Sequence, residues 1–201
     1  MFILIYPGAT MSGLTAVGLF LVSSLFSLLI FCIWLRMALR YFRISSLNPL
    51  NQLIHTITNP LVNPIQLLIK QKAQPVKKYE IATIIVLLLV ELLKIIIISL
   101  IAFHQIMPWQ YLLFYIIADL IIQPCDLLFF AILIRVIMSF VNPAWNGPIA
   151  DFLRILTEPL LKLGRKIVPD ISGFDFSPFI ILMILKVITL FVNANLPWRI
   201  L

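Results

Sequence analysis

Charged residues are scarce in this sequence. Only 11% of its 201 residues are Asp, Glu, Lys or Arg, whereas a soluble domain carries about 25%. Apolar residues make up 62% of the chain, and the mean hydropathy is +1.11. A chain of 23.0 kDa has too little interior to bury so many apolar side chains, so lipid must solvate many of them. The composition therefore predicts an integral membrane protein.

Residues that build catalytic or cofactor sites are also few. Cys32 and Cys125 lie in apolar runs and form no CxxC pair, which argues against a disulfide or a thiolate metal site. His55 and His104 have no acidic or Cys partner at ligand spacing. The six glycines are too scattered for a phosphate-binding loop, and no Ser/His/Asp or Cys/His constellation can be assembled on one side of a membrane. We therefore expect no cofactor, no metal and no enzymatic activity.

Acidic residues are outnumbered by basic ones, 8 against 15, and the net charge is +7. In a soluble protein this excess would suggest nucleic-acid binding. Here the basic residues border hydrophobic spans, where anionic lipid headgroups are the commoner partner, and no aromatic–basic recognition motif is present. We expect lipid headgroups as partners and no nucleic acid.

Four apolar runs are long enough to cross a bilayer, which takes roughly 20 helical residues. They cover residues 14–35, 81–103, 109 to about 135, and 177–196. The third can continue as a helix to Phe140. No basic residue precedes the apolar ones at the start of the chain, so we expect no cleaved signal peptide and a first span that stays in the mature protein.

The segments after the first and third spans are amphipathic. In residues 49–72 and again in 149–167, apolar side chains recur at steps of three and four, which is typical of a helix with one apolar stripe. Pro60, Pro64 and Pro159 interrupt the pattern, so each segment is predicted to form two short helices that are joined by a bend and lie in the membrane interface. The stripes are Leu50, Leu53, Ile54, Ile57, Leu61, Ile65 and Leu68, and then Ile149, Phe152, Leu153, Leu156, Leu160, Leu163 and Ile167.

One block of residues occurs twice, 99 positions apart. In each copy an arginine ends a span, a proline opens the amphipathic connector, and a Thr-x-Pro-Leu sequence follows. Five identities at one offset indicate an internal duplication, with an N-terminal segment 1–13, a first repeat 14–108 and a second repeat 109–201. The matching residues are Arg36, Pro49, Thr58, Pro60 and Leu61 in the first copy and Arg135, Pro148, Thr157, Pro159 and Leu160 in the second.

The basic residues also predict the orientation. Counting Arg36 and Arg135, the two connectors hold seven and five Lys or Arg, whereas the loop between the second and third spans holds none. The positive-inside rule then places both connectors in the cytoplasm and both termini outside. The predicted fold is all-α, with four transmembrane helices as two tandem parallel repeats, each with a Pro-kinked cytoplasmic amphipathic helical hairpin.

Five ionisable residues fall inside the spans: Glu91, Lys94, Asp119, Asp126 and Lys186. Glu91 lies about 15 Å into its span, and Lys186 occupies the equivalent position of the second repeat, so the two are predicted to meet across the repeat axis. Lys94 lies on the same helix face as Glu91. These residues either form a path for a cation or proton or serve as ion pairs that hold the helices together. The second interpretation is favoured, because the first span offers only serines to a permeating ion.

At the duplicated residues the sequence resembles the YggT family of small bacterial integral membrane proteins. The second half carries the pattern best: an arginine that ends a span, a Gly-Pro helix start, Thr-x-Pro-Leu, a basic stretch that leads to a proline, and Asp-x-Ser-Pro at the next span. The first half departs from it after Pro64. The residues that carry the resemblance are Arg135, Gly147, Pro148, Thr157, Glu158, Pro159, Leu160, Arg165, Lys166, Pro169, Asp175, Phe176, Ser177 and Pro178.

The resemblance implies a multi-pass protein of the bacterial cytoplasmic membrane that is linked to osmotic or ionic stress, and it supplies no catalytic residue. With the basic connectors, it favours a non-enzymatic scaffold, assembly or homeostasis factor that binds anionic headgroups and other membrane proteins; self-association is compatible with this. The alternative function is a small cation or proton channel that uses the intramembrane charges. Arg36 and Arg135 either anchor span ends by snorkelling or dock the connector or a headgroup.

Overall fold

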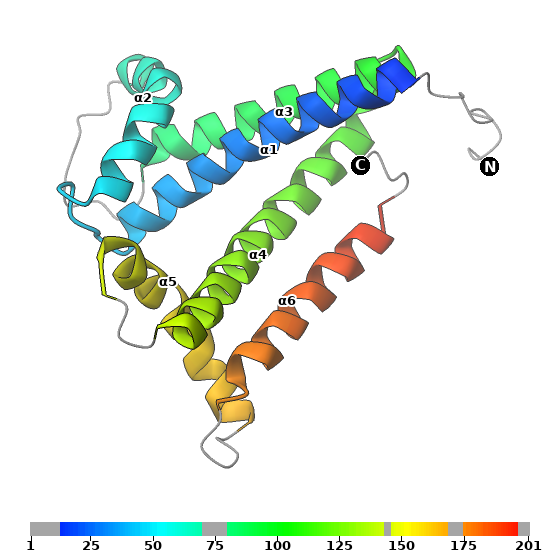
Figure 1. The fold of residues 1–201 in the computed structure, drawn as a ribbon. Helices are drawn as coiled ribbons and strands as arrows, with labels where there is room; N and C mark the ends of the chain where they lie inside the picture. Colours follow the sequence, from blue (N-terminus) through cyan, green and yellow to red (C-terminus); the bar gives the residue numbers. More distant parts are fainter. Residues whose placement is uncertain (1–12, 70–79, 143–145, 169–174, 197–201) are drawn as a thin grey trace.

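The structure is a computed structural model, and it describes residues 13–69, 80–142, 146–168 and 175–196 (Figure 1). These ranges contain six helices and no strand. Four of the helices are long and apolar enough to cross a membrane, as the hydrophobic runs predicted. In chain order the helices are α1 (Gly13–Tyr41), α2 (Pro49–Leu68), α3 (Ile81–Phe103), α4 (Trp109–Val141), α5 (Pro148–Ile167) and α6 (Ser177–Ala194).

The four long helices form two pairs. α1 packs against α3, and α4 packs against α6, so each pair joins the two spans of one sequence half (Figure 1). The shorter helices α2 and α5 lie at the end where α1 and α4 finish and α3 and α6 begin. Each contacts the two long helices of its own half, and α2 also contacts α5. Both connectors therefore lie on one side of the four spans.

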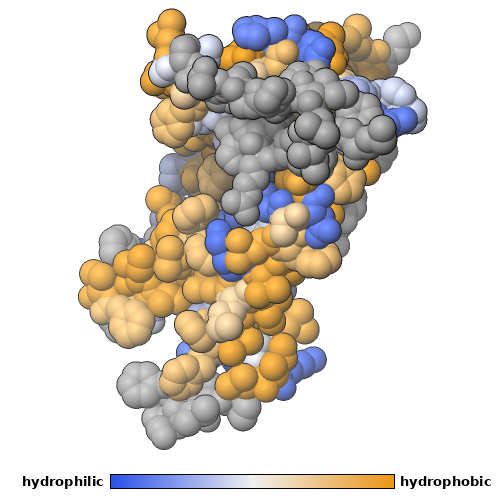
Figure 2. Space-filling model, turned by 90° about the vertical axis from the view of Figure 1, so that its right-hand side faces the viewer, coloured by the Kyte–Doolittle hydropathy of each residue, from blue (hydrophilic) through white to orange (hydrophobic). Residues whose placement is uncertain are grey.

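The largest buried cluster lies at the connector end and combines both halves. Leu35 and Leu39 of α1, Ile54 of α2, Leu127 of α4 and Phe152 of α5 belong to it. Away from this end, many large apolar side chains on the outside of the helices are exposed, such as those of α1 and α6. Figure 2 shows apolar residues over much of the described surface on one face. This distribution suits a chain that lipid surrounds.

The two connector helices begin in different ways. Asn48 precedes Pro49, and its side chain accepts a hydrogen bond from the Leu50 amide at 2.9 Å, which is a normal N-cap. Gly147 precedes Pro148 with φ of +155°, a backbone conformation that favours glycine. Proline is the first helical residue in both cases, where its missing N–H costs nothing.

Each connector is one continuous helix and not the two short helices that were predicted, although the axis of α2 changes direction along its length (Figure 1). Pro60 and Pro64 lie inside α2, and Pro159 lies inside α5. A proline removes a backbone hydrogen bond but does not force the chain out of helix when tertiary contacts hold both sides. Thr58 and Val62, on either side of Pro60, are fully buried. The predicted basic loop with Lys70, Lys72, Lys77 and Lys78 lies outside the described residues.

The contact of α5 with α6 leads to a stability prediction. A Cβ added at Gly164 would lie 2.9 Å from Ser177 Cβ and 3.1 Å from the Ser177 carbonyl oxygen. Gly164→Ala should therefore lower the free energy of unfolding by about 1 kcal/mol, because overpacking outweighs the better helix propensity of alanine. Thermal unfolding in detergent measures it. Gly18→Ala is the matched control, since nothing lies within 4 Å of a Cβ there, and an equal loss at both positions would contradict the prediction.

Candidate functional site

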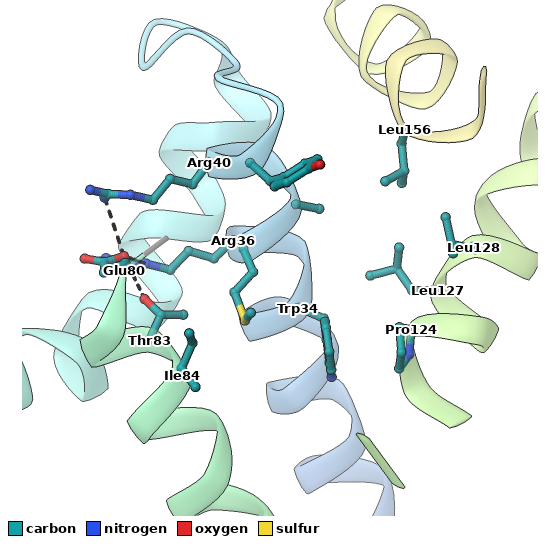
Figure 3. Close-up of a pocket in the computed structure, with 13 residues that line it drawn as sticks. Trp34, Arg36, Arg40, Glu80, Thr83, Ile84, Pro124, Leu127, Leu128 and Leu156 are labelled. Atoms are coloured by element: carbon teal, nitrogen blue, oxygen red, sulfur yellow. Dashed lines mark hydrogen bonds and ion pairs between the residues drawn. The ribbon is translucent and has the colours of Figure 1, made fainter. Parts of the chain in front are cut away.

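The end of α1 carries a buried arginine whose hydrogen bonds are accepted by α2 and by the residue before α3. Nε and Nη2 of Arg36 bond to the Glu80 carboxylate at 3.1 and 3.2 Å. Its Nη1 donates to Thr58 Oγ1 and to Asn59 Oδ1, both at 2.8 Å. Arg40 Nη1 lies 3.6 Å from the same carboxylate (Figure 3). We call these five residues the Arg36 cluster; it fixes α2 to the ends of α1 and α3.

Glu80 holds the Arg36 cluster together. It directly precedes α3 and also accepts hydrogen bonds from Thr83 Oγ1 at 2.7 Å and from the Gln66 side chain. Burial raises the pKa of Glu80, but hydrogen bonds from Arg36 and Thr83 and the charges of Arg36 and Arg40 outweigh it and keep the pKa below its usual value. Glu80 is therefore an ionised partner of two arginines at neutral pH.

The second half repeats this arrangement with different ion pairs. Arg135 Nη1 donates to Thr157 Oγ1 at 2.8 Å, as Arg36 does to Thr58, and its Nη2 donates to Glu158 Oε2 at 2.8 Å. Arg165 bridges Glu158 at 3.2 Å and Asp175 at 3.0 Å. The hydrogen bond from Arg135 is the main cause that lowers the pKa of Glu158. These five residues form the Arg135 cluster.

Four members of each cluster occupy matching positions. Glu80 directly precedes α3 and Asp175 lies two residues before α6, and Gln66 contacts Glu80 as Arg165, 99 residues later, contacts Asp175. In the first half the acid bonds directly to the span-ending arginine. In the second half the acid, Asp175, bonds to Arg165 instead. Glu158 stands at the position of Asn59 and accepts the hydrogen bond from Arg135. The Arg36 cluster is also the more buried, since the Arg36 side chain is 3% exposed and the Arg135 side chain 24%.

Three of the five predicted intramembrane charges come together. Lys94 Nζ lies 2.7 Å from Asp119 Oδ2 and 3.8 Å from Glu91 Oε2. The Gln123 side chain donates to Glu91 Oε1, and Trp34 Nε1 donates to Gln123 Oε1 at 2.9 Å. This polar network of Trp34, Glu91, Lys94, Asp119 and Gln123 joins α1, α3 and α4, and therefore joins the two halves.

The predicted pairing of Glu91 with Lys186 was wrong. Lys186 is exposed, and its Nζ lies 5.7 Å from the centre of the Phe129 ring. Equivalent positions share a depth, but α3 packs against α1, α2 and α4, whereas α6 packs against α4 and α5. Within the described spans, Asp126 forms no ion pair with the polar network either, although it lies on α4 beside Lys186.

A pocket of about 230 Å³ lies where the two halves meet (Figure 3). Arg36, Arg40 and Glu80 line one side, and apolar residues of α4 and α5, among them Leu127 and Leu156, line the other. Among the described residues, no three His, Cys, Asp or Glu side chains could hold a metal ion. The surface that faces the pocket is therefore almost entirely apolar, because the Arg36 and Glu80 side chains are buried in their ion pair.

A family model for CCB3/YggT matches the chain twice, over residues 15–101 and 114–196. The chain belongs to the CCB3/YggT family. The two matched regions also agree with the tandem repeat that the sequence predicted. The first covers α1 to α3 nearly completely, and the second runs from within α4 to the end of α6.

Relatives in this family are similar over most of their length. An uncharacterised protein of Pseudomonas aeruginosa is 32% identical over 190 residues, which is 92% of this chain and 93% of that protein. A protein of Vibrio alginolyticus, also uncharacterised, is 32% identical over 81% of this chain and 85% of its own length. The uncharacterised protein YggT of Escherichia coli K12 is 28% identical over 85% of this chain and 86% of its own length. No solved structure matches the chain.

The remaining motif residues have structural positions. Pro49 and Pro148 begin α2 and α5, Ser177 and Pro178 begin α6, and Lys166 is exposed. Pro169 lies outside the described residues. Sequence reasoning did not select Arg40, Asn59 and Glu80 of the Arg36 cluster, their neighbour Gln66, or Trp34 and Gln123 of the polar network as site residues. Glu80 and Gln66 had a usable signal, because they align with Asp175 and Arg165, whereas Trp34 and Gln123 are ordinary residues of apolar spans.

The two arginines should differ in their effect on stability. Arg36→Gln leaves the buried Glu80 carboxylate without its main partner, which should cost about 3–5 kcal/mol. Arg135→Gln should cost about 1 kcal/mol, because its partners are partly exposed and Glu158 keeps Arg165. Unfolding in detergent measures both variants. Equal losses would show that the two clusters do not differ in the way that their burial indicates.

Proposed function

We propose that this protein is a non-enzymatic membrane scaffold or assembly factor, with a role in osmotic or ionic homeostasis of the bacterial cytoplasmic membrane. In this proposal α2 and α5 form a platform at the cytoplasmic surface that binds anionic headgroups and other membrane proteins. Both termini face the periplasm, as the distribution of Lys and Arg favours. The prolines inside the two connector helices let them bend to follow the membrane surface.

The observation that carries this proposal is the distribution of side chains around α2. Asn51, Ile54, Thr58 and Val62 face inward and are buried. Of the remaining surface, one side is polar, with Gln52, Thr56 and Asn63 exposed. The other side is apolar, with Leu53 57%, Ile57 44%, Leu61 37% and Leu68 77% exposed. A helix with separate buried, wet and apolar faces at the end of a membrane span fits the boundary between lipid and water.

Contacts also hold the two platform helices, α2 and α5, to the membrane spans and to each other. The Arg36 and Arg135 clusters attach each connector to the long helices of its own half. Ile54 of α2 and Phe152 of α5 share one buried cluster, and Asn48 Nδ2 donates to the Pro148 carbonyl at 3.4 Å. A fixed surface suits the recognition of a partner, because binding then orders few side chains.

A channel or transporter for a cation or proton is the second candidate, and the polar network favours it. Glu91 is completely buried, and its Oε2 accepts no hydrogen bond from the described part of the chain. The network holds two carboxylates and one ammonium, a combination that suits a bound proton or cation. However, Asp126 and Lys186 do not extend it, and its contacts bridge three helices, as a structural network would.

Spin labels on α2 test the platform. In the protein reconstituted in bilayers, a label at Leu53 or Ile57 should be relaxed by oxygen, which partitions into lipid, more than by a water-soluble nickel complex. Thr56 is next to Ile57 in the sequence but lies on the exposed polar side of α2. A label there should be relaxed more by the nickel complex than by oxygen. Equal access of the nickel complex to positions 56 and 57 would contradict the placement of α2 at the lipid surface.

Flux measurements separate the two candidate functions. Purified protein in liposomes should pass no more cations or protons than empty liposomes do. Asp119→Asn should lower the free energy of unfolding instead, because Lys94 then loses its partner at 2.7 Å. A flux that Asp119→Asn abolishes while stability is unchanged would refute the scaffold and favour the channel.

A further inference from the structure

A second pocket lies between the end of α4 and the start of α5. Its volume is about 230 Å³, and its polar lining consists of Arg135, Ser139, Asn142 and Arg154. None of the described residues that line it is acidic. Two arginines, a serine and an asparagine line one small pocket, and guanidinium, hydroxyl and amide groups are the donors that hold an oxyanion.

The first half shows what such a pocket can hold. There the Glu80 carboxylate lies against Nε and Nη2 of Arg36 and within 3.6 Å of Arg40 (Figure 3). Arg135 and Ser139 are the equivalents of Arg36 and Arg40, 99 residues later. The acid equivalent to Glu80 is Asp175, and it pairs with Arg165. In the second half the span-ending arginine therefore lacks the equivalent acid, and its carboxylate partner is Glu158, at Nη2.

One edge of the Arg135 guanidinium has room for another acceptor. Nη1 donates to Thr157 Oγ1 and, at 3.5 Å, to the Arg154 carbonyl, while Nη2 donates to Glu158. Within residues 13–69, 80–142, 146–168 and 175–196, nothing accepts a hydrogen bond from Nε. In Arg36 this atom bonds to Glu80 at 3.1 Å. The same atom of the equivalent residue, on a side chain that is 24% exposed, therefore has no acceptor from the described part of the chain and is open to one from outside it.

The surroundings of the pocket indicate which oxyanion it takes. Phe140 and Val141, beside Ser139 and Asn142 on α4, are 81% and 71% exposed, and Ile149 at the start of α5 is 57% exposed. The pocket thus lies at the end of a span beside exposed apolar side chains. The acidic neighbours on α5 are Asp151, which is exposed, and Glu158, which Arg135 and Arg165 already neutralise.

We propose that this pocket binds the phosphate group of an anionic phospholipid. Arg135 Nε and Arg154 hold the phosphate oxygens, Ser139 and Asn142 add hydrogen bonds, and the acyl chains lie on the apolar side chains beside the pocket. The inference rests on the proposed function, which places α5 at the lipid surface, and it adds the site and the class of lipid.

Binding to the full-length protein in neutral detergent tests the site. Dioleoyl phosphatidylglycerol and the matched phosphatidylcholine are titrated and their dissociation constants measured by native mass spectrometry. Phosphatidylglycerol should bind at least tenfold more tightly, and Arg154→Gln should weaken it about tenfold, the effect of losing one charge-assisted hydrogen bond. Inorganic phosphate and glycerol 3-phosphate form the soluble arm. Should they bind as tightly as the lipid, the ligand is a free phosphate and the lipid assignment is overturned.

Lys162→Gln is the matched control, because Lys162 is an exposed cation on the same helix and does not line the pocket. The substitution removes the same charge as Arg154→Gln and should change the affinity for phosphatidylglycerol less than about twofold. In a neutral detergent micelle the bound lipid is the only anionic lipid present, and salt screens its attraction to an exposed lysine outside the pocket. Equal losses in Arg154→Gln and Lys162→Gln would show diffuse attraction and overturn the site. Arg154→Lys keeps the charge but not the planar fork, and should bind with intermediate affinity.

Ser139→Glu decides the matter if Arg154→Gln fails to fold. It puts a carboxylate into the pocket, as Glu80 does in the first half, and should abolish the preference for phosphatidylglycerol without lowering the unfolding temperature of the lipid-free protein. Retained preference would overturn the proposal. The binding assay contains neither a bilayer nor a partner, so a negative result would overturn the lipid site and leave the spin-label result on α2 unaffected. A negative spin-label result would overturn the platform on α2 and leave the measured lipid affinities unaffected.

Discussion

A guanidinium that is buried between helices must find its acceptors within the protein. Arg36 meets this requirement with Glu80, Thr58 and Asn59, from the start of α3 and from α2. Much of the architecture follows from it. The polar side chains of α2 that Arg36 needs have to face inward, and the rotation of the helix that achieves this leaves Leu53, Ile57 and Leu61 outside. A membrane surface can accommodate that apolar face, whereas water would oppose it.

The two halves meet the same requirement with different charges. In the first half two arginines share one carboxylate, and the cluster is deeply buried. In the second half two arginines and two carboxylates alternate, with more exposure. The exchange of Gln66 for Arg165 and of Asn59 for Glu158 moves the acid away from the span-ending arginine. Duplication of a motif thus preserved the contact between arginine and threonine, while the acid that bonds to Nε of the span-ending arginine in the first half bonds to Arg165 in the second.

Much of the fold could be predicted from the sequence, because the relevant signals are local. Lengths of apolar runs placed four spans within a few residues, and the repeat offset of 99 identified Arg36, Arg135, Thr58 and Thr157 as equivalent. Continuity of the connectors could not be predicted, since it depends on how Thr58 and Val62 pack around Pro60. The partner of Glu91 could not be predicted either. A repeat offset fixes depth in the membrane, but the direction in which a side chain points depends on helix packing.

The polar network makes three of the intramembrane charges part of the contact between the repeats. Lipid supplies no hydrophobic force between transmembrane helices, so packing and polar contacts must hold them together. The apolar cluster at the connector end joins the halves there. Nearer the middle of the spans, Trp34 of α1, Lys94 of α3 and Gln123 of α4 carry the connection through hydrogen bonds and ion pairs. Glu91 and Asp119 therefore belong to the contact between the two repeats, which their partners Gln123 and Lys94 form across α3 and α4.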